Sequence, residues 1–97
     1  SIKPMSTTFE LIDKESISAL NFPKVDVLND KEEKASLKSE LDRALSLGNL
    51  EHVKIKIYFE DDKSKKMVET TIWGVTDERV ILKQGAVIPV NRIYKIV

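Results

Sequence analysis

The feature that most constrains the fold is a change in hydrophobic period at His52. From Val53 onward, apolar residues alternate with polar ones: Val53, Ile55, Ile57 and Phe59 are interleaved with His52, Lys54, Lys56, Tyr58 and Glu60. A period of two places alternate side chains on opposite faces of a β-strand. The pattern therefore predicts a strand with one buried face and one polar face.

The segment before this strand has a helical period. Asp30 followed by Glu33 resembles a capping box, and an apolar stripe follows at Leu37, Leu41, Ala44 and Leu45. We expect a helix over 30–47 that packs through Leu37, Leu41 and Leu45, with Gly48 as its left-handed C-terminal residue. The charged side chains of the opposite face are interpreted as a solvated surface: Lys34, Lys38, Glu40, Asp42 and Arg43.

Four more short strands are predicted after the first, over 67–75, 79–83, 86–89 and 93–97. Charged or Gly-containing turns separate them, and Gly74 beside Trp73 marks a bend or bulge. Five short strands with tight turns favour closure, because a barrel leaves no unpaired edges. The predicted fold class is mainly β with an N-terminal helix, a five-stranded SH3/Sm-like small barrel. Its inward residues should be Val53, Ile55, Ile57, Phe59, Ile72, Val80, Leu82, Ile88 and Ile93.

Residues 29–97 are thus expected to form the helix-plus-barrel domain, and residues 1–28 an N-terminal arm. Thr8 to Leu11 alternate as a short strand would, and 13–20 have room for a helical turn or two. The arm carries enough large apolar residues to dock on the domain, and a flexible arm is the alternative.

Several runs of residues in this chain resemble known protein families. The spacing of three groups of residues is similar to that of the Sm core, including Hfq-like chains: Thr71-Ile72-Trp73-Gly74-Val75, then Val80 to Lys83, then Ile93 and Val97. The run from Gly85 to Ile93 resembles the end of the Rho-binding antiterminator family. The resemblance covers about 33–97 and implies an Sm-like fold. Hfq-like chains have a basic Tyr-Lys-His run where this chain has Pro89-Val90-Asn91, so no RNA contact is transferred there.

Composition argues against an enzyme and against a membrane protein. The chain has no cysteine and a single His52, and its glycines are isolated, so thiolate sites, a catalytic triad and a Gly-rich phosphate loop are not expected. We expect no cofactor and no metal. The Asp61-Asp62 and Asp77-Glu78 pairs are expected in solvated turns. The lack of cysteine suits a reducing compartment, and with no long apolar run or signal peptide we expect a cytoplasmic protein.

The candidate binding residues lie on the polar face of the first strand. Lys54, Lys56 and Tyr58 share that face, and Lys63, Lys65 and Lys66 follow in the expected turn. Cations beside an aromatic ring are what a single-stranded nucleic-acid site requires. Trp73 is a further candidate: core or half-core packing is favoured, and the alternative is a place on an accessible rim as an interaction anchor. Arg92, near Tyr94, is expected either to share that rim or to belong to a plain turn.

Two functions stay open at this point. The first is a nucleic-acid-binding or gene-regulatory module, and residues 49–97 hold nine Lys/Arg against seven Asp/Glu. The alternative is a protein-interaction adaptor domain, which suits a net charge of +0 over the whole chain. Lysines on an exposed strand can also serve only to block edge pairing. The sequence leaves both monomer and oligomer open.

Overall fold

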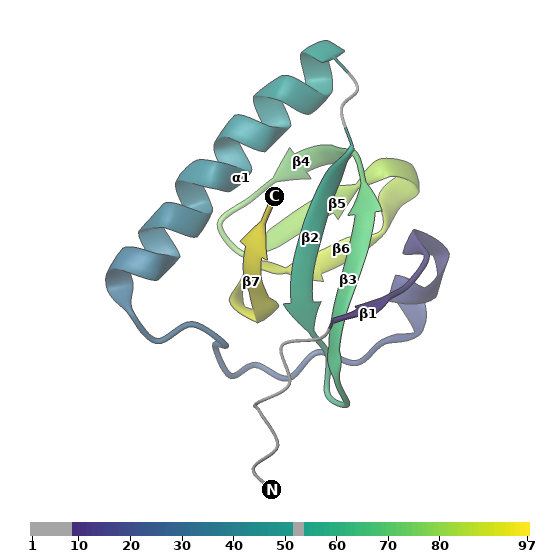
Figure 1. Ribbon diagram of the computed structural model, residues 1–97, viewed down its shortest axis with the longest axis vertical. Coiled ribbons are helices and arrows are strands. Elements are labelled where there is room, and N and C mark those ends of the chain that lie inside the picture. The colour runs from purple at the N-terminus through teal and green to yellow at the C-terminus, as the bar shows by residue number, and fades with distance from the viewer. Residues whose placement is uncertain (1–8, 52–53) are drawn as a thin grey trace, which may run out of the picture.

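A computed structural model of the chain describes residues 9–51 and 54–97. His52 and the predicted inward residue Val53 therefore lie outside the described residues. In the described part the protein is mainly β with one α-helix, as the sequence predicts, and its strands are divided between two sheets (Figure 1). The helical elements are η1 (Lys14–Ala19, 3-10), α1 (Lys31–Glu51), η2 (Lys83–Gly85, 3-10) and η3 (Val90–Arg92, 3-10). The strands are β1 (Glu10–Leu11), β2 (Ile55–Glu60), β3 (Lys65–Thr70), β4 (Ile72–Val75), β5 (Arg79–Leu82), β6 (Val87–Pro89) and β7 (Ile93–Ile96).

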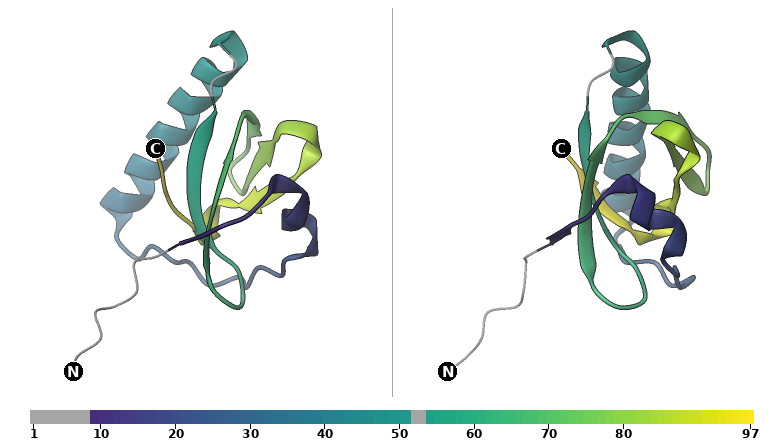
Figure 2. Two further views of the ribbon diagram at one scale, coloured as in Figure 1. Left: turned by 45° about the vertical axis from the view of Figure 1, so that its right-hand side comes forward. Right: turned by 90° about the vertical axis from the view of Figure 1, so that its right-hand side faces the viewer.

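The strands form one four-stranded sheet in the order β1-β3-β2-β7 and one three-stranded sheet in the order β4-β5-β6. Neighbouring strands are antiparallel except for β1, which pairs with β3 in parallel. Figure 2 shows the two sheets facing each other, with α1 across one open side. The hydrophobic core lies between these layers.

The core confirms the predicted pattern of inward residues. Alternate side chains of β2 point inward, so Ile55, Ile57 and Phe59 are buried while Lys56 is exposed. The other predicted inward residues within the described part are also buried: Ile72, Val80, Leu82, Ile88 and Ile93. Val68 and Ile17 join this cluster without having been predicted.

Helix α1 begins as predicted and ends later than predicted. The Asp30 Oδ1 atom accepts a hydrogen bond from the Glu32 N–H at 2.8 Å, which caps the helix. Leu37 and Leu41 are buried and Leu45 is half-buried, which confirms the predicted packing face. The prediction for Gly48 was wrong, because the helix continues through it to Glu51. A glycine inside a helix is tolerated at a modest loss of stability.

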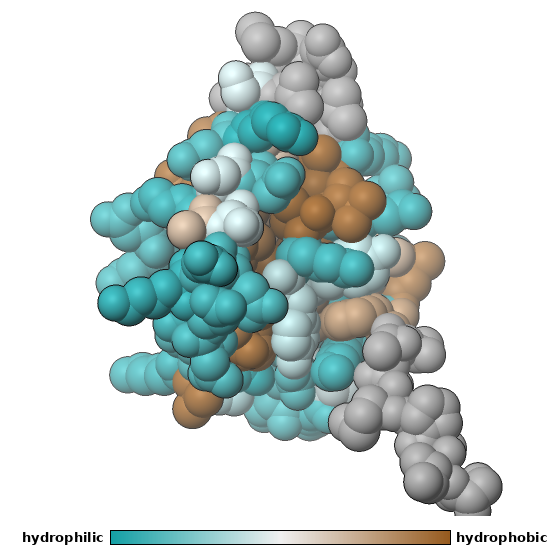
Figure 3. Space-filling model, turned by 60° about the vertical axis from the view of Figure 1, so that its left-hand side comes forward, coloured by the Kyte–Doolittle hydropathy of each residue, from teal (hydrophilic) through white to brown (hydrophobic). Residues whose placement is uncertain are grey.

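The charged face of α1 is exposed to solvent, as interpreted from the sequence. With the helix side brought forward, most of the visible surface is hydrophilic, and hydrophobic side chains show in several places between the hydrophilic ones (Figure 3). Among the described residues, no helix is both long and apolar enough to cross a membrane.

The predicted second strand is in fact two strands. β3 ends at Thr70 and β4 begins at Ile72, so the chain passes from one sheet to the other at the buried Thr71. The pairing of β4 with β5 changes register between Ile72 and Gly74, which confirms the bulge predicted at this glycine.

The segment 9–28 lies against the two sheets. β1 adds to the edge of β3, and η1 then contacts both β3 and β6 and buries Ile17. Helix α1 contacts β4 and β7. Each of these helical elements therefore bridges the two sheets, with α1 and η1 on opposite sides of the strands in Figure 1.

Candidate nucleic-acid interface

The outer face of the four-stranded sheet holds the predicted residues Lys54, Lys56 and Tyr58. Lys54 directly precedes β2 and is exposed, Lys56 is exposed on β2, and Tyr58 is half-buried two residues further on. Glu69 of β3 is the cross-strand partner of Lys56 and is also exposed. The predicted arrangement of two cations and a ring on one side of a strand is therefore present.

Neighbouring elements add residues that the sequence interpretation did not assign to this face. β7 contributes Tyr94 and Lys95, and the pairing of β2 with β7 shifts register between Tyr58 and Phe59. Lys95 is the partner of Tyr58, and its Nζ atom lies 5.0 Å from the centroid of the Tyr58 ring. Because of this register shift, the alternation of residues in the sequence alone could not predict that Lys95 lies beside Tyr58.

Phe9 and Lys65 complete the cluster. The Phe9 ring lies edge-to-face with Tyr58 at a centroid distance of 4.9 Å and with Tyr94 at 5.8 Å. The Lys65 Nζ atom lies 5.9 Å from the centroid of Phe9 and 5.4 Å from that of Tyr94. An ammonium within about 6 Å of a ring centroid is attracted by the ring's quadrupole. We call the set of lysines and tyrosines the basic-aromatic face, against whose rings Phe9 packs: Lys54, Lys56, Tyr58, Lys65, Tyr94 and Lys95.

Charge on the basic-aromatic face is positive on balance. Its four lysines face two outward glutamates of the same strands, Glu60 and Glu69. The Tyr94 hydroxyl donates a hydrogen bond to Glu60 Oε1, which occupies that carboxylate. Burial, the hydrogen bond and the negative charge of Glu60 together raise the pKa of Tyr94 to about 12. The Tyr94 phenol therefore keeps its neutral, hydrogen-bond-donating form to a higher pH than an ordinary tyrosine does.

The other two candidate residues do not join this face. Trp73 lies on β4 in the other sheet and is 53% exposed, so the expectation of a core or half-core tryptophan was wrong. Its neighbour Ile72 takes the inward position, which leaves the indole outside.

Arg92 was wrongly expected on an accessible rim. It is only 7% exposed, and its guanidinium donates to three main-chain carbonyls: Glu60 from Nε, Val25 from Nη1 and Asp61 from Nη2. It ties the segment before α1 to the end of β2. Its fork geometry suits this role and leaves it unavailable to a ligand.

The turn after β2 also differs from the prediction. Asp61 is 2% exposed rather than solvated, and its Oδ1 atom accepts hydrogen bonds from the Lys63 N–H, the Ser64 N–H and the Lys66 ammonium. Burial alone would raise the Asp61 pKa, but these donors outweigh it and hold the pKa below its ordinary value of 3.8. Lys66 is 8% exposed and lies in β3, so it is not part of an exposed basic turn.

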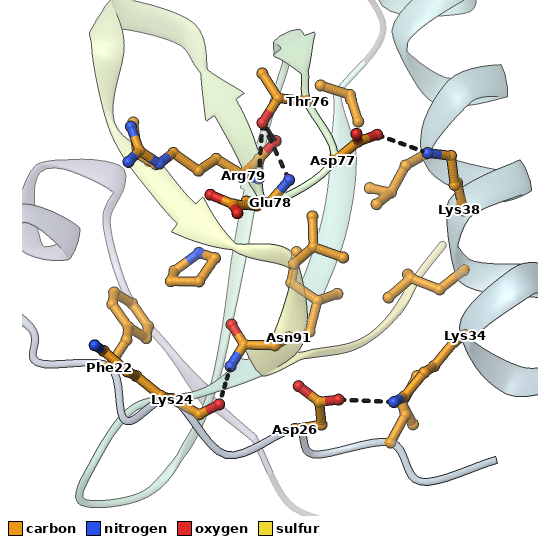
Figure 4. A pocket seen from close by; sticks show the side chains of 18 residues that line it. Phe22, Lys24, Asp26, Lys34, Lys38, Thr76, Asp77, Glu78, Arg79 and Asn91 are labelled. Atoms are coloured by element: carbon orange, nitrogen blue, oxygen red, sulfur yellow. Dashed lines mark hydrogen bonds and ion pairs between the residues drawn. The ribbon is translucent and has the colours of Figure 1, made fainter. Parts of the chain in front are cut away.

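A separate groove of about 1010 Å³ lies between α1, the β4–β5 turn and the segment 22–28 (Figure 4). Leu37, Leu41 and Phe22 contribute to its apolar lining. Two ion pairs join α1 to its other walls: Lys34 to Asp26 at 2.7 Å and Lys38 to Asp77 at 3.1 Å. Within the described part of the chain, no group of three or more potential metal-ligating side chains was found.

Comparison with known proteins does not identify a family. No family model, no curated protein and no solved structure matches the chain.

Proposed function

We propose that this protein is a non-enzymatic module that binds single-stranded nucleic acid on the basic-aromatic face. The observation that carries the proposal is the placement of the Lys95 ammonium 5.0 Å from the Tyr58 ring, among further lysines and rings. Single-strand sites combine cations that follow the phosphates with aromatic rings on which bases stack. Here both are held on one sheet, which is a rigid support.

The charges favour a site that follows the backbone rather than one that reads bases. Lys56 and Lys95 are exposed on the adjacent antiparallel strands β2 and β7, and the exposed Lys54 directly precedes β2. Few side chains capable of specific hydrogen bonds to base edges belong to this face, so stacking and phosphate contacts should dominate. Binding should therefore be tolerant of sequence and sensitive to salt.

The fold we propose for this role is a small SH3/Sm-like barrel. In orthogonally packed sheets, strands that switch sheets through a bend make the corners. The passage of β3 into β4 at Thr71 is such a switch, and η3 returns the chain from β6 to β7. This connectivity supports the resemblance to Sm-like chains without transferring any of their contacts.

The test is a fluorescence anisotropy titration of labelled oligo(U) and oligo(dT), each of about 12 nucleotides, at two salt concentrations. We expect salt-dependent binding by the wild type and its loss in the Lys54→Glu/Lys56→Glu variant. The control is Arg43→Glu/Lys83→Glu, which makes the same charge change at two exposed positions on α1 and η2. The change in log Kd from the wild type should be less than half as large for the control as for the Lys54→Glu/Lys56→Glu variant.

Comparable loss in both variants would mean that net charge matters and the face does not. If the wild type shows no salt-dependent binding to either strand at tens of micromolar, the nucleic-acid proposal fails. Recognition of another protein would then become the favoured function, because the groove beside α1 offers an apolar surface with a polar rim.

A further inference from the structure

Phe9 packs against both of the tyrosine rings that the proposed function requires. It contacts Tyr58 and Tyr94 edge-to-face, with interplanar angles of 79° and 73°. The ammonium of Lys65 lies near the same phenyl ring. A base stacking on either tyrosine would compete with the Phe9 side chain for this space.

The segment that carries Phe9 is attached by few contacts. β1 has two residues, Glu10 and Leu11, and both are exposed. Its link to β3 continues at Ile12, whose N–H donates to the Met67 carbonyl at 3.0 Å. Glu10 also approaches the Lys66 ammonium, at 4.0 Å.

The first deeply buried anchor after β1 is Ile17, which is 2% exposed. Residues 9–11 can therefore leave the sheet without removing a fully buried side chain from the core. Short edge pairings of this kind open at a small fraction of the free energy of global unfolding.

We infer that Phe9 and β1 form a displaceable cap, which occupies the stacking position on Tyr58 and Tyr94 until a nucleic-acid strand replaces it. The inference rests on the proposed function and adds a regulatory element to the same site. In the closed form, the phenyl ring of Phe9 makes the aromatic contacts with Lys65 and both tyrosines that a bound base would make in its place.

The cap lowers the apparent affinity by the fraction of molecules in which it is open. If about one molecule in ten is open, removing the cap strengthens binding by about 10-fold, and locking it shut weakens binding by at least that factor. A phenyl ring that instead served as a permanent stacking platform would give the opposite sign, because its loss would weaken binding.

Two variants test the cap from opposite directions. Phe9→Ala removes the competing ring. Leu11→Cys/Met67→Cys places a cysteine pair at Cα partners of the β1–β3 ladder, in a chain that has no other cysteine, so that oxidation locks β1 and reduction frees it. The probe is labelled oligo(U) of about 12 nucleotides at low salt.

We expect about 10-fold tighter binding by Phe9→Ala. The oxidised cysteine pair should bind at least about 10-fold more weakly than the same protein reduced. Weaker binding by Phe9→Ala, or equal binding by the oxidised and reduced forms, would overturn the cap while leaving the proposed function in place. If neither the wild type nor Phe9→Ala binds at any salt concentration, the proposed function itself has failed and the cap with it.

Discussion

Replacing Asp61 with alanine should destabilise the protein more than any other change to a charged side chain in the β2–β3 turn. The substitution removes the acceptor of three hydrogen bonds, two from main-chain N–H groups at 3.0 and 2.9 Å and one from the Lys66 ammonium at 3.0 Å. Lys66 is itself buried, so its charge would lose its closest anionic partner. Breaking a buried pair by removing one partner costs about 3–5 kcal/mol.

That loss is a large part of the free energy of unfolding of a small domain, about 5–15 kcal/mol. For a domain of about 100 residues it corresponds to a fall in Tm of at least about 12 °C. Thermal and urea unfolding followed by circular dichroism measure it. The matched control is Asp62→Ala at the adjacent exposed position, which should change stability by no more than about 0.5 kcal/mol.

The Asp61 contribution should also depend on pH. Because the folded-state pKa of Asp61 is depressed, its stabilisation is present above the unfolded value of 3.8 and is lost as the pH falls through the folded pKa. The stability difference between the wild type and Asp61→Asn should therefore shrink from about pH 7 to about pH 2. Equal losses of stability in Asp61→Ala and Asp62→Ala would refute the stabilising role of the buried Asp61 carboxylate. A stability difference between the wild type and Asp61→Asn that does not change with pH would refute it as well.

Three further predictions follow from packing and hydrogen bonding. Leu41→Ala empties a fully buried site under α1 and should cost about 2–4 kcal/mol in urea unfolding; a loss under about 0.5 kcal/mol would contradict the packing of the helix on the sheets. Arg92→Lys cannot reproduce the fork that reaches three carbonyls and should cost about 1–3 kcal/mol, whereas an unchanged Tm would show that the clamp is dispensable. Tyr94 should ionise near pH 12 in a difference titration of the wild type against Tyr94→Phe. Because the pKa of Tyr94 is higher in the folded than in the unfolded protein, its stabilising contribution is fully present below the unfolded-state pKa of 10.0 and is lost as the pH rises through about 12. Ionisation of Tyr94 near pH 10 would exclude the hydrogen bond to Glu60.

The parts of the fold that were predictable depend on local periodicity. The alternation through Ile55, Ile57 and Phe59 follows from the strand repeat, and the packing of Leu37 and Leu41 follows from the helical one. The Gly74 bulge was also readable, because glycine inside a strand pattern marks a local irregularity.

The parts that were not predictable depend on contacts between distant segments. Arg92 is buried because segments 31 and 67 residues away supply carbonyls to it, and no local pattern records that. Lys66 was assigned to a turn because it ends a run of charged residues, and its buried ion pair with Asp61 was not predicted. Gly48 was expected to end α1 on propensity alone, and the helix continues past it.

The candidate site was predictable only along one strand. Lys54, Lys56 and Tyr58 share a face by alternation, whereas Lys95 reaches Tyr58 through an irregular pairing. Phe9 reaches the same ring through a parallel pairing of segments more than fifty residues apart, and short-range sequence signals do not specify such pairings.

The most direct measurement is a nitrogen-15 NMR titration of the wild type with unlabelled oligo(U), which maps the bound surface residue by residue. The proposal predicts that shifted amides cluster at 54–58, in β3 from Lys65 to Glu69 and at Tyr94 and Lys95, and that 34–41 and 75–79 around the groove stay unchanged. Shifts concentrated around the groove, or none at saturating oligonucleotide, would contradict the assignment of the basic-aromatic face as the binding site.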